Sequence, residues 1–170
     1  MKKIFGVLFV ISIIYLISLI ETNNYEIFGL QATGSAQILP SFCGKTMEQW
    51  ENENAIIIIG TEDSDRLVGT NTVDLIIGLG GDDFISGRSG NDCILGGDGN
   101  DRLLGEKGVD IIFGGKGNDR IHGGSGDDIL DGGYGDDRVD GNKGNDSIDG
   151  FFGIDDCNGG KGDDTIINCE

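Results

Sequence analysis

The sequence predicts an all-β fold, a parallel solenoid of twelve nine-residue repeats wound into about six two-strand turns. The nine-residue period runs from Gly60 to Ile167 without insertion or deletion, with Gly at the first position and Asp at the sixth in all twelve repeats. The eighth position is Leu, Ile or Val in eleven repeats, and Cys157 is the exception. A period held over 108 residues indicates a repeat architecture.

The N-terminal segment has the features of an export signal. Lys2 and Lys3 precede an uncharged run from Ile4 to Ile20, which matches the charged start and apolar core of a signal peptide. The run is also near the lower length limit of a membrane-spanning helix. We interpret residues 1–36 as a signal peptide or a membrane anchor with a polar spacer. The protein is then secreted, or attached to the cell surface if the segment is retained.

The next segment, residues 37–59, is predicted to form an N-terminal cap and a starting strand. Residues 37–54 show no repeat and contain Trp50, the only Trp of the chain. Residues 55–59 are an apolar run that leads straight into Gly60. In the repeat register this run ends a preceding, incomplete unit, so we expect it to be the first strand.

Within each repeat of residues 60–167 we expect a turn followed by a short strand. The six Gly-rich positions suit tight turns rather than strand interiors. The last three, such as Arg120-Ile121-His122, alternate out, in and out as a minimal strand. Repeats n and n+2 then stack at about 4.8 Å, and the eighth positions supply the core. These are Leu67, Ile76, Ile85, Ile94, Leu103, Ile112, Ile121, Leu130, Val139, Ile148 and Ile166. Residues 168–170 form a C-terminal tail.

The acidic composition calls for a cationic partner. The 170 residues carry a net charge of −18. Unit charges about 5 Å apart repel by roughly 0.8 kcal/mol even in water, so twelve stacked Asp side chains need a counter-charge. Nucleic acid is a poor partner for so acidic a chain, and we expect none. A metal cation is the natural partner.

The stacked repeats supply oxygen ligands of the kind that calcium prefers. Each turn brings a sixth-position Asp beside the Asp two repeats on, with backbone carbonyls freed by the glycines between them. Mixed carboxylate and carbonyl oxygens, six or more per ion, are typical of calcium. Zinc is disfavoured, because His122 is the single His and the four Cys are scattered. An EF-hand is excluded, because no 12-residue loop ends in Glu.

The pattern G-G-x-G-x-D-x-U-x resembles the RTX, or haemolysin-type, calcium-binding nonapeptide repeats. The resemblance implies a parallel β-roll with calcium between successive turns on each side. On one edge it places Asp83, Asp101, Asp119, Asp137 and Asp155, and on the other Asp92, Asp110, Asp128, Asp146 and Asp164. The loop glycines of the five best-matching repeats are Gly96, Gly99, Gly114, Gly117, Gly123, Gly126, Gly132, Gly135, Gly159 and Gly162.

Departures from the pattern weaken the first two repeats. Asp63 and Thr72 replace the fourth-position Gly there, so Asp65 and Asp74 are expected to be weaker metal ligands. Pairing repeats 3 to 12 at a spacing of two leaves about eight calcium sites, and at most ten. Eight calcium ions would bring +16 against the net charge of −18.

Outward-facing positions differ between odd and even repeats. Odd repeats show Arg66, Arg102, Arg120 and Arg138 at position seven, which predicts a solvated sheet. Even repeats present an apolar stripe, and such a patch is usually covered. We expect residues 37–54 to cover it. The alternative is a dimer interface or an adhesive surface that meets a protein partner.

The four cysteines suggest two disulfides, since we place the repeats outside the cytoplasm. Four cysteines allow three pairings. We favour Cys43–Cys93 and Cys157–Cys169, because these pairs would staple the two ends of the coil.

These observations favour an extracellular calcium-ion-binding repeat protein that folds on calcium binding. The alternative is a calcium-scaffolded surface adhesion or matrix protein. An extracellular hydrolase needs a nucleophile, a base and an orienting group in one cleft. No such constellation stands apart from the Asp ladder, so we expect no enzyme activity and no catalytic residues.

Overall fold

The computed structural model describes residues 41–46, 49–50, 53 and 55–170, in two units that we treat separately, Met1–Glu48 and Gln49–Glu170. The predicted signal or anchor segment lies outside the described residues. Among the residues that are described, no helix is long and apolar enough to cross a membrane.

The first unit contains a small antiparallel hairpin, in which β1 (Ser41–Phe42) pairs with β2 (Lys45–Thr46). Its two turn residues, Cys43 and Gly44, have φ values of 50° and 75°. Positive φ at both central residues is what a two-residue hairpin turn requires.

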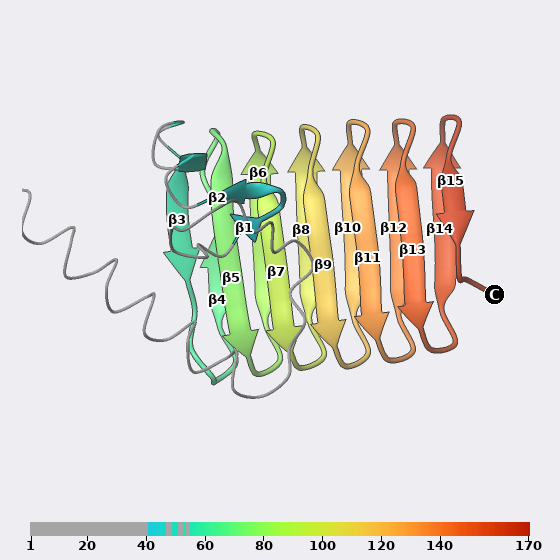
Figure 1. The fold of residues 1–170 in the computed structure, drawn as a ribbon, viewed down its shortest axis with the longest axis horizontal. Helices are drawn as coiled ribbons and strands as arrows, with labels where there is room; N and C mark the ends of the chain where they lie inside the picture. The colour runs from blue at the N-terminus through green and yellow to red at the C-terminus, as the bar shows by residue number, and fades with distance from the viewer. Residues whose placement is uncertain (1–40, 47–48, 51–52, 54) are drawn as a thin grey trace, which may run out of the picture. The chain divides into compact units, whose positions relative to one another are not determined.

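The second unit is a parallel β-solenoid of about six coils, as the sequence predicts (Figure 1). Each coil adds one strand to each of two sheets. The six-strand sheet contains β4 (Arg66–Val68), β6 (Phe84–Ser89), β8 (Arg102–Lys107), β10 (Arg120–Ser125), β12 (Arg138–Lys143) and β14 (Asp156–Lys161). The seven-strand sheet contains β3 (Ile56–Ile59), β5 (Asp74–Gly80), β7 (Cys93–Asp98), β9 (Ile111–Lys116), β11 (Ile129–Tyr134), β13 (Ser147–Phe152) and β15 (Thr165–Ile167).

Strand β3 begins the seven-strand sheet at the place where the sequence predicts the starting strand. Its register with β5 pairs Ile57 with Leu75 and Ile58 with Ile76. These partners are 18 residues apart. We call residues 56–167 the roll, and the register partners in the rest of it are also 18 residues apart.

The strands are longer than predicted. Most contain six residues, because each continues from positions seven to nine of one repeat into positions one to three of the next. The prediction that all six Gly-rich positions form turns was therefore wrong. Pairing between β10 and β12 runs over Arg120, Ile121 and His122, skips Gly123 and resumes at Gly124. The first-position glycine thus interrupts the ladder of Cα partners without ending the strand.

A single column of aliphatic side chains forms the core between the two sheets. Nine of the predicted eighth-position residues are at most 1% exposed, and Leu67 packs partly buried against them. Ile166 is 41% exposed, contrary to prediction. It lies on β15, the last strand of its sheet, which has a neighbouring strand on one side only. The nine are Ile76, Ile85, Ile94, Leu103, Ile112, Ile121, Leu130, Val139 and Ile148.

The fourth-position glycine is required by both conformation and space. Gly117 has a φ of 122°, which side chains rarely adopt. A Cβ added there would collide with the carbonyl oxygen of Gly99, two repeats earlier. Stacked turns therefore approach too closely for any larger residue at this position.

The C-terminal end of the roll is closed by the Cys157–Cys169 disulfide, whose Cα atoms are 5.8 Å apart. The sequence predicted this pair, and Cys157 occupies the core position where other repeats have an aliphatic residue. The predicted Cys43–Cys93 bond would join the two units, whose relative placement is not defined, so it stays a prediction.

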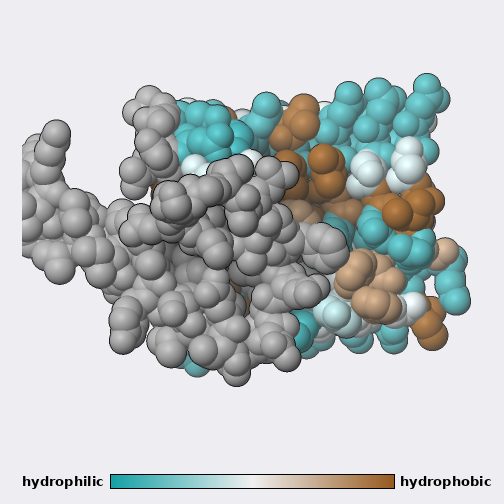
Figure 2. Space-filling view, in the orientation of Figure 1, coloured by the Kyte–Doolittle hydropathy of each residue, from teal (hydrophilic) through white to brown (hydrophobic). Residues whose placement is uncertain are grey.

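Outward-facing apolar side chains at position seven of the seven-strand sheet become more exposed from β5 to β11. Leu75 is fully buried, whereas Ile129, in the same column, is 47% exposed. Nearby, Tyr134 stacks on Phe152 with ring centroids 5.2 Å apart, and Phe151 meets both rings edge-on. Figure 2 shows apolar side chains over strands at this C-terminal end, in the part of the view that grey atoms leave free. The predicted cover by residues 37–54 stays a prediction.

The thin core predicts strong sensitivity to truncation. Ile121→Ala should lower the free energy of unfolding by about 2–5 kcal/mol, because it opens a cavity in a fully buried column. The matched change Ile129→Ala, at an exposed position, should cost less than about 1 kcal/mol. Urea denaturation in the presence of calcium measures both. Equal losses for the two variants would show that the column is not the core.

Candidate metal centre

The sixth-position aspartates line the two edges of the roll in the turns that join the sheets. The structure brings together the two sets that the sequence assigned to opposite edges, each set linked by hydrogen bonds between residues 18 apart. Their side chains are almost completely inaccessible. Ten of them are at most 3% exposed: Asp74, Asp83, Asp92, Asp101, Asp110, Asp119, Asp128, Asp137, Asp146 and Asp155.

One oxygen of each carboxylate ties neighbouring coils together. The backbone N–H of Asp101 donates to Oδ1 of Asp119 at 2.7 Å, and the N–H of Asp119 donates to Oδ1 of Asp137 at 2.8 Å. The same bond recurs along both edges. From Asp83 to Asp164, each carboxylate therefore reaches back to the main chain of the preceding coil on its edge, which fixes the position of the turn.

The other oxygen of these carboxylates has no partner. Oδ2 is buried and accepts no hydrogen bond in nine of the aspartates. A buried polar atom left without a partner is expensive, and more so when it is charged. The nine residues are Asp83, Asp92, Asp101, Asp110, Asp119, Asp128, Asp137, Asp146 and Asp155.

A backbone carbonyl shares the space around each unpartnered oxygen. A Cβ added to Gly123 would lie 2.5 Å from Oδ2 of Asp128 and 3.1 Å from the carbonyl oxygen of Gly141. The first-position glycine is thus required for space. Because a side chain is absent there, a carboxylate oxygen and a carbonyl oxygen of successive coils face the same small region.

Burial raises the pKa of these carboxyls. Desolvation is the main cause, and it raises the pKa of Asp92, Asp119 and Asp128 to about 7 although the backbone N–H bond opposes it. Repulsion from the stacked carboxylates adds to the shift in all three. The same causes, led by desolvation, raise the pKa of Asp101 and Asp137 to about 6. Protons are therefore held at pH values where aspartates are normally ionised.

In the first two repeats, unlike the later ones, Oδ2 of the sixth-position Asp accepts hydrogen bonds. Oδ2 of Asp65 accepts hydrogen bonds from the backbone N–H and the hydroxyl of Thr61, at 2.6 and 2.9 Å. Thr70 makes the corresponding bonds to Asp74. The second-position Thr thus supplies the partners that the later repeats lack. The sequence expectation that these two positions are weaker ligands stays a prediction, and this feature of the turn supports it.

Asp164, the last predicted ligand, is less enclosed. It is half-buried, and its Oδ1 accepts the backbone N–H of Asp146 at 3.0 Å. The strand that follows it, β15, is the last of its sheet among the described residues.

A second ladder of side chains was missed by the sequence analysis. At position five, the backbone N–H of Asn118 donates to Oδ1 of Asn100 at 2.9 Å, and the N–H of Asp136 donates to Oδ1 of Asn118 at 2.9 Å. These bonds point toward the preceding coil's side chain, opposite to the bonds of the sixth position. The available signal was the recurrence of Asp or Asn at position five in eight repeats.

The oxygen atoms of these edges fit a hard divalent cation. The carboxylate and carbonyl oxygens that converge there are the ligand types of calcium. No group of three or more His, Cys, Asp or Glu side chains gathers in the described part of the chain. A cage built from side chains, as zinc takes, is therefore absent from that part, and backbone oxygens must supply many of the ligands.

A comparison with known families agrees with this chemistry. A family model described as RTX calcium-binding nonapeptide repeat (4 copies) matches residues 59–94, 95–130 and 131–166. No curated protein matches the chain significantly.

The raised pKa values predict that acid favours the metal-free roll. A carboxyl whose pKa lies above its unfolded value near 3.9 contributes stability that is fully present below that value. The contribution is lost as the pH rises through 6 to 7, the pKa range of the central carboxyls. In a chelating buffer, far-UV circular dichroism should show more β structure at about pH 5 than at pH 8. A β signal that falls on acidification would contradict this linkage.

Proposed function

Because the chain belongs to the family of RTX calcium-binding nonapeptide repeat proteins, we propose that it is an extracellular protein whose β-roll folds as it binds calcium. The observation that carries this proposal is the set of nine buried Oδ2 atoms without a partner. No hydrogen-bond donor among the described residues reaches these atoms, and a cation would compensate them. Calcium suits the oxygen ligands around them.

The proposed ligands are the sixth-position aspartates of repeats 3 to 12, with the carbonyl oxygens of the turn glycines beside them. Asp119 and the carbonyl of Gly132, which converge on Gly114, are one such combination. Calcium supplies the positive charge that the stacked carboxylates lack. About eight ions per chain would fill the gaps between repeats two apart, and Asp65 and Asp74 take the weaker role.

Folding is coupled to calcium because the ligands converge only in the coiled chain. In the unfolded chain the aspartates are solvated and far apart, so a cation that binds the folded form alone shifts the equilibrium toward it. Extracellular calcium modules typically bind at about 10⁻⁴–10⁻³ M. The chain would therefore stay unfolded at cytosolic calcium concentrations and fold after export.

Two features support an extracellular location. The Cys157–Cys169 disulfide is of the kind that persists in oxidising compartments, and the apolar run near the N-terminus suits export. We assign no catalytic role. His122, the only His, is half-exposed on the outer face of β10, and its Nδ1 lies 3.9 Å from Oδ2 of Asp140.

Calcium titration tests the proposal directly. In a chelating buffer at pH 8, the full chain should lack β structure by far-UV circular dichroism. Millimolar calcium chloride should induce it, with about eight ions bound per chain by equilibrium dialysis. The same β signal with and without calcium would reject the coupling of folding to the metal.

Two matched substitutions sharpen the titration. Asp119→Asn removes the charge of a buried carboxylate with an unpartnered Oδ2, so it should raise the calcium concentration needed for folding and lower the number of bound ions. Asp127→Asn removes the same charge from an exposed position-five residue, and its amide oxygen can still accept the N–H of Asn145. This control should fold as the unaltered chain does. Equal behaviour of the two variants would place the calcium ligands elsewhere.

A second candidate function, a calcium-scaffolded adhesion or matrix protein, is favoured by the exposed apolar end of the seven-strand sheet. Tyr134 and Phe152 are 54% and 57% exposed there. This function predicts that the folded chain associates with itself or a partner through the aromatic side chains. Phe152→Ser should weaken self-association in sedimentation velocity, whereas Val109→Ser, at an exposed turn, should not. A chain that is monomeric at all concentrations would count against self-association through this surface.

A further inference from the structure

Basic residues are gathered on one sheet of an otherwise acidic roll. Residues 60–167 contain nine Lys and Arg, and only Lys116 belongs to the seven-strand sheet. The other eight belong to the six-strand sheet and are all exposed. They are Arg66, Arg88, Arg102, Lys107, Arg120, Arg138, Lys143 and Lys161.

These residues form rows across the strands. Strands β8 and β12 each begin with Arg and end with Lys. Arg102, Arg120 and Arg138 are direct register partners on adjacent strands, and the strands are about 4.8 Å apart. Lys143 and Lys161 are register partners in the same way. Like charges side by side in a sheet are destabilising.

Little within the described part of the chain compensates these charges. Arg138 has one ion pair, Nε to Oδ2 of Asp156 at 3.9 Å, and both side chains are exposed. The other seven basic residues make no ion pair with any described residue. Arg66 instead lies over the ring of Phe84, 4.3 Å from its centroid. Proteins break a local rule of this kind mainly at functional sites, so these rows indicate a functional surface.

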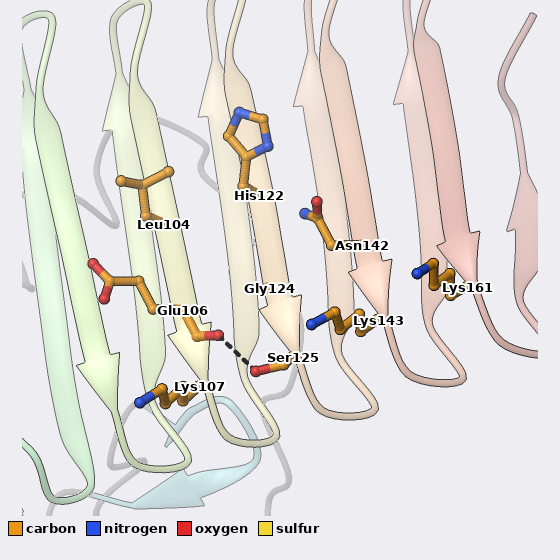
Figure 3. Close-up of a pocket in the computed structure, with 9 residues that line it drawn as sticks. All are labelled: Leu104, Glu106, Lys107, His122, Gly124, Ser125, Asn142, Lys143 and Lys161. Atoms are coloured by element: carbon orange, nitrogen blue, oxygen red, sulfur yellow. Dashed lines mark hydrogen bonds between the residues drawn. The ribbon is translucent and has the colours of Figure 1, made fainter.

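Lys107, Lys143 and Lys161 form the lysine row, and Arg102, Arg120 and Arg138 form the arginine row. A shallow trough of about 580 Å³ lies beside the lysine row. Figure 3 shows Lys107, Lys143 and Lys161 in a line across the strands, with Ser125 between the first two. His122 lines the side of the trough that faces the arginine row, and Asn142 lies between His122 and the lysine row. The lining also contains Leu104 and one carboxylate, Glu106, whose Oε1 accepts a hydrogen bond from the Ser86 hydroxyl at 2.6 Å. Three lysines and one glutamate thus border a mainly hydrogen-bonding surface that runs along the axis of the roll.

We propose that the six-strand sheet binds a linear acidic polysaccharide laid across the strands. Its carboxylate or sulfate groups pair with the arginine and lysine rows, and its hydroxyls bond to the polar side chains of the trough. A sugar unit is about as long as one strand spacing, so a regular chain can match successive rows. The inference rests on the proposed function, because the rows exist only in the folded roll.

The surface favours this ligand over other polyanions. Single-stranded nucleic acids need aromatic rings on which bases stack, and the ring of Phe84, the only Phe, Tyr or Trp on these six strands, is already covered by Arg66. Membranes favour basic surfaces that also carry large apolar groups. None of the exposed large apolar side chains among the described residues lies on this sheet.

Binding of the full chain to dextran sulfate, with uncharged dextran as the comparison, tests the proposal. In calcium, after circular dichroism has confirmed folding, the chain should bind dextran sulfate and not dextran, and added salt should weaken binding. The triple variant R102Q/R120Q/R138Q should bind at least about tenfold more weakly, since it loses three charge contacts. Lys116→Gln, which removes a charge from the opposite sheet, should change affinity less than about twofold.

Each outcome decides the inference. Binding by the triple variant as tight as that of the unaltered chain would overturn it. So would tighter binding to single-stranded DNA or to vesicles of phosphatidylcholine and phosphatidylglycerol. If the triple variant does not fold in calcium, the single variant Arg120→Gln and the lysine-row variant K107Q/K143Q/K161Q replace it. If the chain folds with calcium but does not bind dextran sulfate, only this inference is refuted. If calcium does not fold the chain, the proposed function is refuted.

Discussion

The roll depends on one constraint, the stacking of identical carboxylates in register along each edge. In repeats 3 to 11 the sixth-position Asp uses Oδ1 to hold the main chain of the preceding coil, and its Oδ2 stays buried without a partner. The bond fixes the turn, and the unpartnered oxygen creates the demand for a cation. The two glycines of the turn follow from the same constraint. Gly123 leaves room for Oδ2 of Asp128, and Gly117 lets its turn stack on the carbonyl of Gly99.

Charge is sorted by position within the repeat. Acidic side chains occupy the turns at positions five and six, whereas Arg occupies the first residue of several strands in the six-strand sheet. Residues 18 apart are neighbours in the stack, so the same residue type at one repeat position forms a continuous row along the roll. The two bands differ in burial. The position-six carboxylates are enclosed and demand a counter-ion, whereas the guanidinium groups are open to a large ligand.

The sequence predicted the coil, its two sheets and the core column, because a strict period determines which residues stack. It did not predict strand length, because glycine-rich positions were expected to turn. At position two the backbone tolerates a positive φ even for Glu106 and Asn142 while the pairing continues. The bonds of Thr61 and Thr70 were also missed, since they depend on side-chain geometry within single turns. The position-five ladder was visible as a composition bias, but its hydrogen bonds depend on how the side chains lie in the stacked turns.

The alternation of the two sheets sets the step in which such a chain can change length. Successive repeats feed opposite sheets, so loss or gain of a single nonapeptide would transpose every downstream strand to the other side. Such a change upstream of Arg102 would move the arginine and lysine rows together to the sheet that carries Ile57 and Leu75. An insertion between Lys107 and Arg120 would instead divide them between the two sheets. Removal of two adjacent repeats shortens the coil by one full winding and leaves both surfaces in place. The roll can therefore change length without mixing its two surfaces only in steps of two repeats, or 18 residues, although the sequence period is nine.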